Sequence, residues 1–127
     1  MRIRLEQGLA FVEAVLTFRG RPFRLPNVVL DTGSGGTIFS ADRLFDIGIS
    51  PEPLDTLRRI RGVGGVEFVF TRVIDELVAG DLVVTQFKIE VGAMDYGFDA
   101  EGILGLDFLV ASGATIDFRR LDLAASK

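Results

Sequence analysis

The chain has 127 residues, of which 48% are hydrophobic and 25% charged, and this length and composition are typical of a single globular domain spanning residues 1–127. Fourteen Lys and Arg against eighteen Asp and Glu give a formal net charge of −4, which argues against nonspecific binding to nucleic acid or to an anionic membrane. The absence of Cys and His excludes His-based triads, thiolate nucleophiles, disulfides and zinc sites built on imidazole or thiolate ligands.

The N-terminal segment lacks an apolar stretch of signal-peptide length. No run approaches the ~20 apolar residues that a membrane span needs. We therefore expect a cytoplasmic protein with no membrane partner and no nucleic-acid partner.

Most of the first third of the chain reads as strands. Residues 9–18 alternate, with one face made of Ala10, Val12, Ala14, Leu16 and Phe18. Residues 19–22 predict a turn. Residues 23–30 predict a second strand, in which Pro26 restricts the first half to an edge or irregular position.

A short helix follows, with Ser40 as its N-cap, an end at Phe45 or Asp46 and Gly48 as its stop signal. Residues 56–61 and 66–79 then predict two strands. They are joined by a glycine-rich hairpin tip made of Gly62, Val63, Gly64 and Gly65.

Residues 82–91 alternate again, which predicts a strand with a shared face of Val83, Thr85, Phe87, Ile89 and Val91. Beyond a loop at 92–101 we expect a short buried piece at 103–105, a helix within 107–112 closed by Gly113, and strands at 114–118 and 121–124. The whole pattern indicates an all-β domain with one or two short helices, arranged as a closed or partly closed barrel.

The chemistry concentrates at Asp31, which follows the apolar residues 28–30. A carboxylate in that place is costly to bury alone, but glycines and hydroxyls in 32–37 can hold it in a defined orientation near solvent. A plain turn is one alternative, because Asp, Gly, Ser and Thr are turn formers. A phosphate-cradling loop is another, which the absence of Lys before Lys88 disfavours.

Residues 31–37 read Asp-Thr-Gly-Ser-Gly-Gly-Thr. This segment resembles the active-site motif of the aspartic proteases, and specifically that of the single-domain retropepsin-like enzymes. The glycine-rich hairpin 62–65 is similar to that family's flap. Residues 103–105, with the helix after them, are similar to its late apolar-apolar-Gly element. The three elements occur in the family's order and cover roughly residues 10–124.

The resemblance implies an acid dyad that activates one water, and this chain has a single Asp-Thr-Gly. Asp95, Asp107 and Asp117 lack its flanking pattern; Asp107 is interpreted as a helix cap. The dyad therefore requires a C2 homodimer that brings two copies of Asp31 together. No metal and no organic cofactor are implied.

The resemblance also assigns roles around Asp31. Thr32 is expected to hydrogen-bond across the dimer axis, Gly33 to contact the substrate backbone, and Ser34 to bond the outer carboxylate oxygen. In the flap, Val63 is expected to contact substrate. Many viral members carry acidic residues that hold the substrate backbone where this chain has Gly35 and Gly36.

The sequence thus predicts an aspartic endopeptidase that cleaves between mostly apolar residues. The alternative is a non-catalytic dimeric module that binds extended peptides on the same fold. A nucleotide or phosphoester site at residues 33–36 is a weaker third hypothesis. Arg58, Arg59 and Arg61 are interpreted as a solvated strand face, with steering of an acidic substrate as the alternative.

Overall fold

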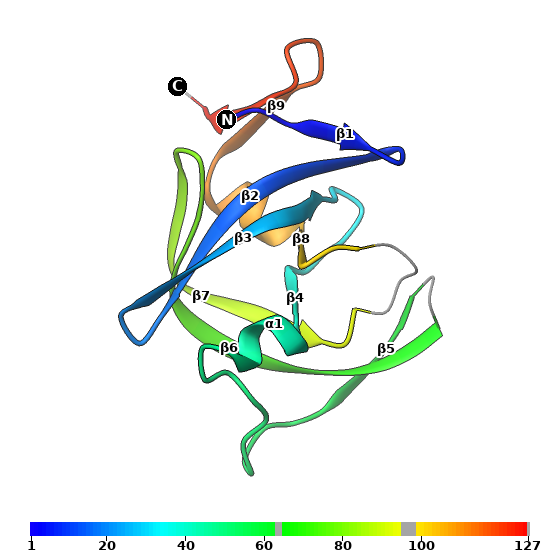
Figure 1. Ribbon diagram of the computed structural model, residues 1–127, viewed down its shortest axis with the longest axis vertical. Coiled ribbons are helices and arrows are strands. Elements are labelled where there is room, and N and C mark those ends of the chain that lie inside the picture. The colour runs from blue at the N-terminus through cyan, green and yellow to red at the C-terminus, as the bar shows by residue number, and fades with distance from the viewer. Residues whose placement is uncertain (63–64, 95–98, 127) are drawn as a thin grey trace.

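The computed structural model describes residues 1–62, 65–94 and 99–126 (Figure 1). Its elements follow one another along the chain as β1 (Arg4–Glu6), β2 (Leu9–Phe18), β3 (Arg21–Leu30), β4 (Ile38–Ser40), α1 (Ala41–Phe45), β5 (Arg58–Gly62), β6 (Gly65–Ala79), β7 (Leu82–Gly92), β8 (Gly102–Leu104), α2 (Leu106–Ala111), β9 (Ala114–Asp117) and β10 (Asp122–Ala125). The expected all-β fold with two short helices is confirmed.

The main sheet curls into a partly closed ring. Its strand order is β1-β2-β3-β8-β4-β7-β6-β5, and an additional pairing of β2 with β6 joins Val15 to Val78 and Leu16 to Leu77. That pairing closes the six strands β2, β3, β8, β4, β7 and β6 on themselves, while β1 and β5 lie outside the closure. A ring of this kind leaves few unpaired strand edges and encloses one core.

Strands β2 and β3 form a hairpin whose turn is shorter than expected. Arg19 and Gly20 both have positive φ, and Arg21 and Pro22 already pair with β2. Two residues with positive φ suit the right-handed twist of the flanking strands. The expectation of an edge or irregular first half of β3 is confirmed as an edge, because that half pairs with β2 and only Val28 to Leu30 pair with β8. The register shift between Val12 and Ala14 falls opposite Pro26 and Asn27, where the first half ends.

The short helix α1 forms where expected. The Ser40 side chain accepts from the Arg43 backbone N–H, as an N-cap does, and Gly48 adopts φ +87° just beyond the helix. Helix α2 begins one residue earlier than expected, at Leu106, with Gly105 as its N-cap. Asp107 therefore lies inside the first turn, and the prediction that it caps the helix is wrong.

The predicted shared face of residues 82–91 is also wrong in its first half. Val83 and Thr85 are exposed, whereas Leu82 is buried and Val84 packs against the core. Gln86 adopts φ +49°, and from Phe87 onward the odd-numbered residues face the core instead. One residue outside the extended region thus reverses which side of β7 is buried, and simple alternation does not anticipate it.

Two apolar clusters lie on opposite faces of the central strands. The larger cluster fills the ring and includes Phe39, Leu104 and Phe108. The smaller cluster contains Ile38, Val69 and Met94, with Ala100 and Ile103 packed against it. Ile38 and Phe39 are neighbours in β4 and point to opposite faces, as the period of a strand requires.

Both described ends of the chain lie together with β9 and β10 at the top of Figure 1. Ile3 N–H donates to Leu121 O (2.8 Å) and Leu123 N–H donates to Met1 O (2.9 Å). The β9–β10 hairpin is therefore tied to the N-terminus by backbone hydrogen bonds. Among the described residues no helix has the length and apolar character needed to span a membrane.

Candidate active site

Asp31 stands at the end of β3, where the strand leaves the sheet. Val28, Val29 and Leu30 pair in parallel with Gly102, Ile103 and Leu104 of β8, and Asp31 N–H donates to Leu104 O (3.0 Å). The side chain is half-buried. The backbone at Asp31 is thus fixed by the sheet, while its carboxylate stays within reach of solvent.

The turn after Asp31 is organised around its carboxylate. Gly33 N–H donates to Asp31 Oδ1 (2.9 Å), and Ser34 N–H donates to Asp31 O (3.2 Å). A Cβ on Gly33 would lie 3.2 Å from Asp31 Oδ1, so a larger residue would crowd the carboxylate. A backbone N–H bonded to a carboxylate sets the orientation of that carboxylate.

Thr32 and Ser34 have different surroundings. Thr32 is exposed and lines an open pocket, described below. The Ser34 hydroxyl donates to Gly36 O (2.8 Å), so its one proton is not available for the Asp31 bond that we expected. In this chain Ser34 shapes the loop, and the carboxylate is bonded by the Gly33 amide.

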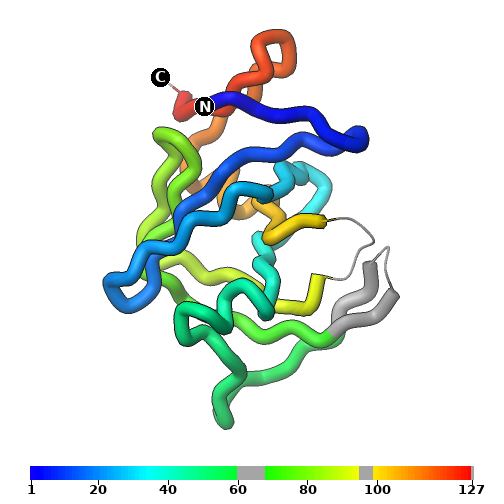
Figure 2. The backbone as a smooth tube through the Cα atoms, viewed as in Figure 1, coloured from blue at the N-terminus to red at the C-terminus, as the bar shows by residue number. Residues whose placement is uncertain are grey.

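Residues 103–105 pack directly beneath this loop, as expected, and Figure 2 shows the two segments side by side at the centre of the fold. A Cβ on Gly105 would collide with the backbone carbonyl of Gly36 and would lie 2.9 Å from Ser34 O. Leu106 N–H donates to Ser34 O (2.7 Å). Only glycine permits this approach of two backbones, because any Cβ would push them apart.

Thr37 joins the two segments, and sequence reasoning gave it no role of its own. Its side chain is buried, with the residue 1% exposed. Gly105 N–H donates to Thr37 Oγ1 (3.0 Å), and Thr37 Oγ1 donates to Asp107 Oδ1 (2.7 Å). Thr37 is the last residue of the segment 31–37 that resembles the family's active-site motif, so the sequence alone could have indicated that it has a role.

Asp107 is consequently a support for the loop. Its Oδ1 accepts from both Thr37 Oγ1 and Phe108 N–H (2.7 Å each). The buried hydroxyl of Thr37 therefore has one donor and one acceptor partner, which satisfies a polar group that would otherwise be costly to bury.

One face of the sheet carries Asp31 and an apolar strip beside it. Residues paired across a ladder point to the same side, as do residues two apart in a strand. Val29 pairs with Ile103, and Ile103 with Ile38, so Asp31 shares a face with both isoleucines. This is the face of the smaller cluster, in which Ile38 and Val69 are buried and Ile103 is half-buried.

The expected flap forms a hairpin at the edge of the sheet. Strand β5 pairs with β6 from Arg58 opposite Val69 to Gly62 opposite Gly65. Val63 and Gly64 lie outside the described residues, so the predicted substrate contact of Val63 stays a prediction. Arg58 and Arg59 are exposed, but Arg58 forms an ion pair with Glu90 of β7.

A pocket of about 370 Å³ opens on the other side of the motif, where Thr32 meets α2 and β9. It is lined by Thr32, Leu106, Leu109, Val110, Gly113, Ala114, Ile116 and Ser126. Val110 is 71% exposed, and Leu106 and Phe118 are also exposed. Over residues 1–62, 65–94 and 99–126 no group of three acidic side chains gathers closely enough to hold a metal ion.

A family model described as "Aspartyl protease" matches residues 14–108, a range that contains Asp31, the hairpin and Gly105. The chain therefore belongs to the aspartyl protease family. No curated protein matches its sequence.

Among solved structures, the chain is similar to a retropepsin-like aspartic protease from Rickettsia conorii, with a TM-score of 0.64 and 19% sequence identity. The similarity covers 90% of this chain and 88% of that one. The fold is thus retropepsin-like, and fold and family together support aspartic protease activity in general.

Proposed function

We propose that this protein is an aspartic endopeptidase whose catalytic dyad is formed by Asp31 from each of two identical subunits. The observation that carries the proposal is the placement of Asp31: a half-buried carboxylate, held by the Gly33 amide, beside an apolar strip in a chain of the aspartyl protease family.

The chemistry requires two carboxylates. Two like charges a few ångströms apart do not both ionise, so such a pair holds one proton between them. The ionised carboxylate takes a proton from the attacking water, and the protonated one hydrogen-bonds the substrate carbonyl. These roles belong to the pair and exchange during the reaction.

The surface around Thr32 supports a homodimer with this geometry. Thr32 is exposed next to the apolar side chains of Leu106 and Val110. Within the described residues β9 pairs only with β10, which leaves its other edge free for a second copy. A second subunit seated on this surface would cover apolar area and place Thr32 against its counterpart, beside the two Asp31 side chains.

The substrate is an extended peptide with apolar residues at the cleaved bond. Ile103, the half-buried member of the apolar cluster on the Asp31 face, offers an extended chain an apolar contact beside the acid, and the buried Ile38 and Val69 pack behind it. The β5–β6 hairpin would then close over the peptide and exclude water, the role that we assign to Gly62, Val63, Gly64 and Gly65.

The test is digestion of an unbiased peptide library from pH 3 to 8 at protein concentrations that favour dimers, with products read by mass spectrometry. We expect cleavage by the wild type and none by Asp31→Asn. Asp42→Asn, which removes an acid in the first turn of α1, is the matched control and should cleave normally. Equal cleavage by Asp31→Asn would overturn the proposal.

Val110→Asp tests the dimer separately. A charge at this exposed apolar position should convert dimer to monomer in sedimentation analysis and abolish cleavage without unfolding the protein. Saturable peptide binding by a folded, dimeric wild type that makes no product at any pH would favour the non-catalytic binding module instead.

A further inference from the structure

The Asp31 face of the sheet continues beyond its apolar strip to a charged pair. Ile38 of β4 pairs in parallel with Glu90 of β7, so the Glu90 side chain lies on the same face as Ile38 and Asp31. Glu90 pairs in turn with Thr71 of β6. Moving outward from the acid along this face, one meets Ile103, Ile38 and then the Glu90 carboxylate.

The end of the Glu90 side chain lies against Gly36, in space that the Cβ of a larger residue would share. A Cβ built on Gly36 would collide with Glu90 Oε1 and lie 3.5 Å from Glu90 Cδ. Glu90 N–H also donates to Thr37 O (2.8 Å), which ties its backbone to the end of the catalytic loop. The Glu90 carboxylate is therefore held beside the end of the loop that begins at Asp31.

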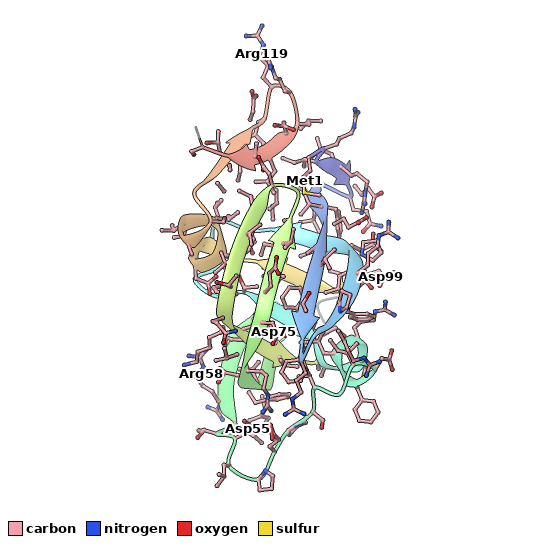
Figure 3. The ribbon with its side chains drawn as sticks, turned by 90° about the vertical axis from the view of Figure 1, so that its left-hand side faces the viewer. Met1, Asp55, Arg58, Asp75, Asp99 and Arg119 are labelled. Carbon is pink, nitrogen blue, oxygen red and sulfur yellow. The ribbon has the colours of Figure 1, made fainter. Side chains whose placement is uncertain are left out.

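Arg58 holds the other oxygen of this carboxylate. Its guanidinium forms an ion pair and hydrogen bond with Glu90 Oε2. Arg58 opposes Val69 in the β5–β6 ladder, so it too belongs to the Asp31 face, and Figure 3 shows it at the edge of the sheet. The side chain of Glu90 is 19% exposed and that of Arg58 is 63% exposed.

We infer that Glu90 is a specificity-determining residue, which binds a Lys or Arg side chain of the peptide at a subsite beyond the apolar residues at the cleaved bond. This inference rests on the proposed function and names a substrate preference of that same site.

The difference in exposure between Arg58 and Glu90 determines whether the subsite binds a positive or a negative side chain. Glu90 is the more buried, fixed partner, and Arg58 is the solvated one, on a strand that pairs only with β6 among the described strands. An incoming cation can replace the Arg58 guanidinium, which returns to water at little cost. An incoming carboxylate would instead take Arg58 from Glu90 and leave a half-buried charge without its partner, beside a second negative charge.

The experiment uses the Asp31→Asn protein as an immobilised, folded binder and selects peptides from a library in which each position is Lys, norleucine or Glu. We expect Lys to be enriched over norleucine by roughly tenfold at one position, the size of one charge-assisted contact. Adding Glu90→Gln should bring that ratio to about one, because the charge is lost while the shape is kept.

Two further variants separate recognition from a general charge effect. Gly36→Ala should displace the flexible end of Glu90 and also lower the Lys enrichment, whereas Arg58→Ala should raise it by freeing the carboxylate. Lys88→Gln is the matched control, because Lys88 is exposed and lies two residues before Glu90 on the same face of β7. It should leave the Lys enrichment unchanged. Equal ratios in the Asp31→Asn protein with and without Glu90→Gln would overturn the inference.

Cleavage of the same library by the protein with native Asp31 distinguishes the two proposals. Lys enrichment without any cleavage would overturn the endopeptidase and leave the Glu90 subsite standing. Cleavage with no Lys enrichment would overturn the subsite and leave the endopeptidase standing. Cleavage products carrying Lys at the selected position support both.

Discussion

The two glycine-rich segments of this chain, the loop 31–37 and the hairpin joining β5 to β6, are held in very different ways. The loop receives hydrogen bonds from Gly105 and Leu106 and lies in backbone contact with Gly105. In the described part of the hairpin, β5 pairs with β6 alone and lies at the end of the strand order.

We expect this difference to separate the residues that stabilise the fold from those that bind the substrate. A dyad must hold its carboxylates within fractions of an ångström, and a loop braced by buried hydrogen bonds meets that requirement. A lid has to open for the substrate, and a single ladder at a sheet edge is the kind of structure that can open locally. We therefore expect substitutions beneath the loop to destabilise the protein, and substitutions of exposed hairpin residues to leave its stability nearly unchanged.

Gly105→Ala should have the largest effect on stability. The added Cβ meets the Gly36 backbone, which cannot move aside without disturbing Asp31, so we expect a loss of about 3 kcal/mol in the free energy of unfolding. Urea denaturation measures it. Gly35→Ala is the control, because its Cβ would meet nothing within 4 Å. Equal midpoints for the two variants would contradict the close packing of the two backbones.

Thr37→Val should have the next largest effect. The substitution keeps the shape but leaves the buried Gly105 N–H without its acceptor, at a cost of about 1–3 kcal/mol. It also removes the donor to Asp107. The same denaturation experiment checks it, with the exposed Thr85→Val as control. A variant as stable as Thr85→Val would mean that the hydroxyl does not brace the loop.

Phe68→Ser tests how much an exposed residue of the hairpin contributes to the stability of the protein. Phe68 lies on β6 within the β5–β6 ladder and is 61% exposed, so we expect the free energy of unfolding to change by no more than about 0.5 kcal/mol. A loss as large as that of Thr37→Val would show that the hairpin is braced as firmly as the loop.

The smallest expected effect lies far from both segments. The hydrogen bond from the Arg24 guanidinium (2.7 Å) lowers the pKa of the Glu13 carboxyl from its usual value. A lowered pKa in the folded state adds stability above the unfolded pKa, and this is lost as the pH falls through the folded one. Glu13→Gln should therefore lower the melting temperature slightly at pH 7 and not at strongly acid pH. A difference that persists in acid would contradict this linkage.

Local patterns were sufficient for most of the secondary structure. Apolar alternation predicted β2, and the Ser40 cap predicted α1, because both signals act within a few residues. The pattern failed at Gln86, whose positive φ reverses the buried face of β7 and leaves Val83 exposed. A single residue outside the extended region leaves no mark on the hydropathy pattern.

The sequence by itself determined the family resemblance. It also led to the proposals that Asp31 is the catalytic acid and that a second subunit supplies its partner, since a chain with one Asp-Thr-Gly motif supplies one carboxylate. Only the tertiary structure decided what surrounds that acid. Thr37 meets Gly105 and Asp107 across separations of 68 and 70 residues, and Arg58 meets Glu90 across 32. Contacts between residues so far apart in the sequence depend on which strands pair and in what register. The pairing and the register are determined by burial of the whole core rather than by neighbours in the chain.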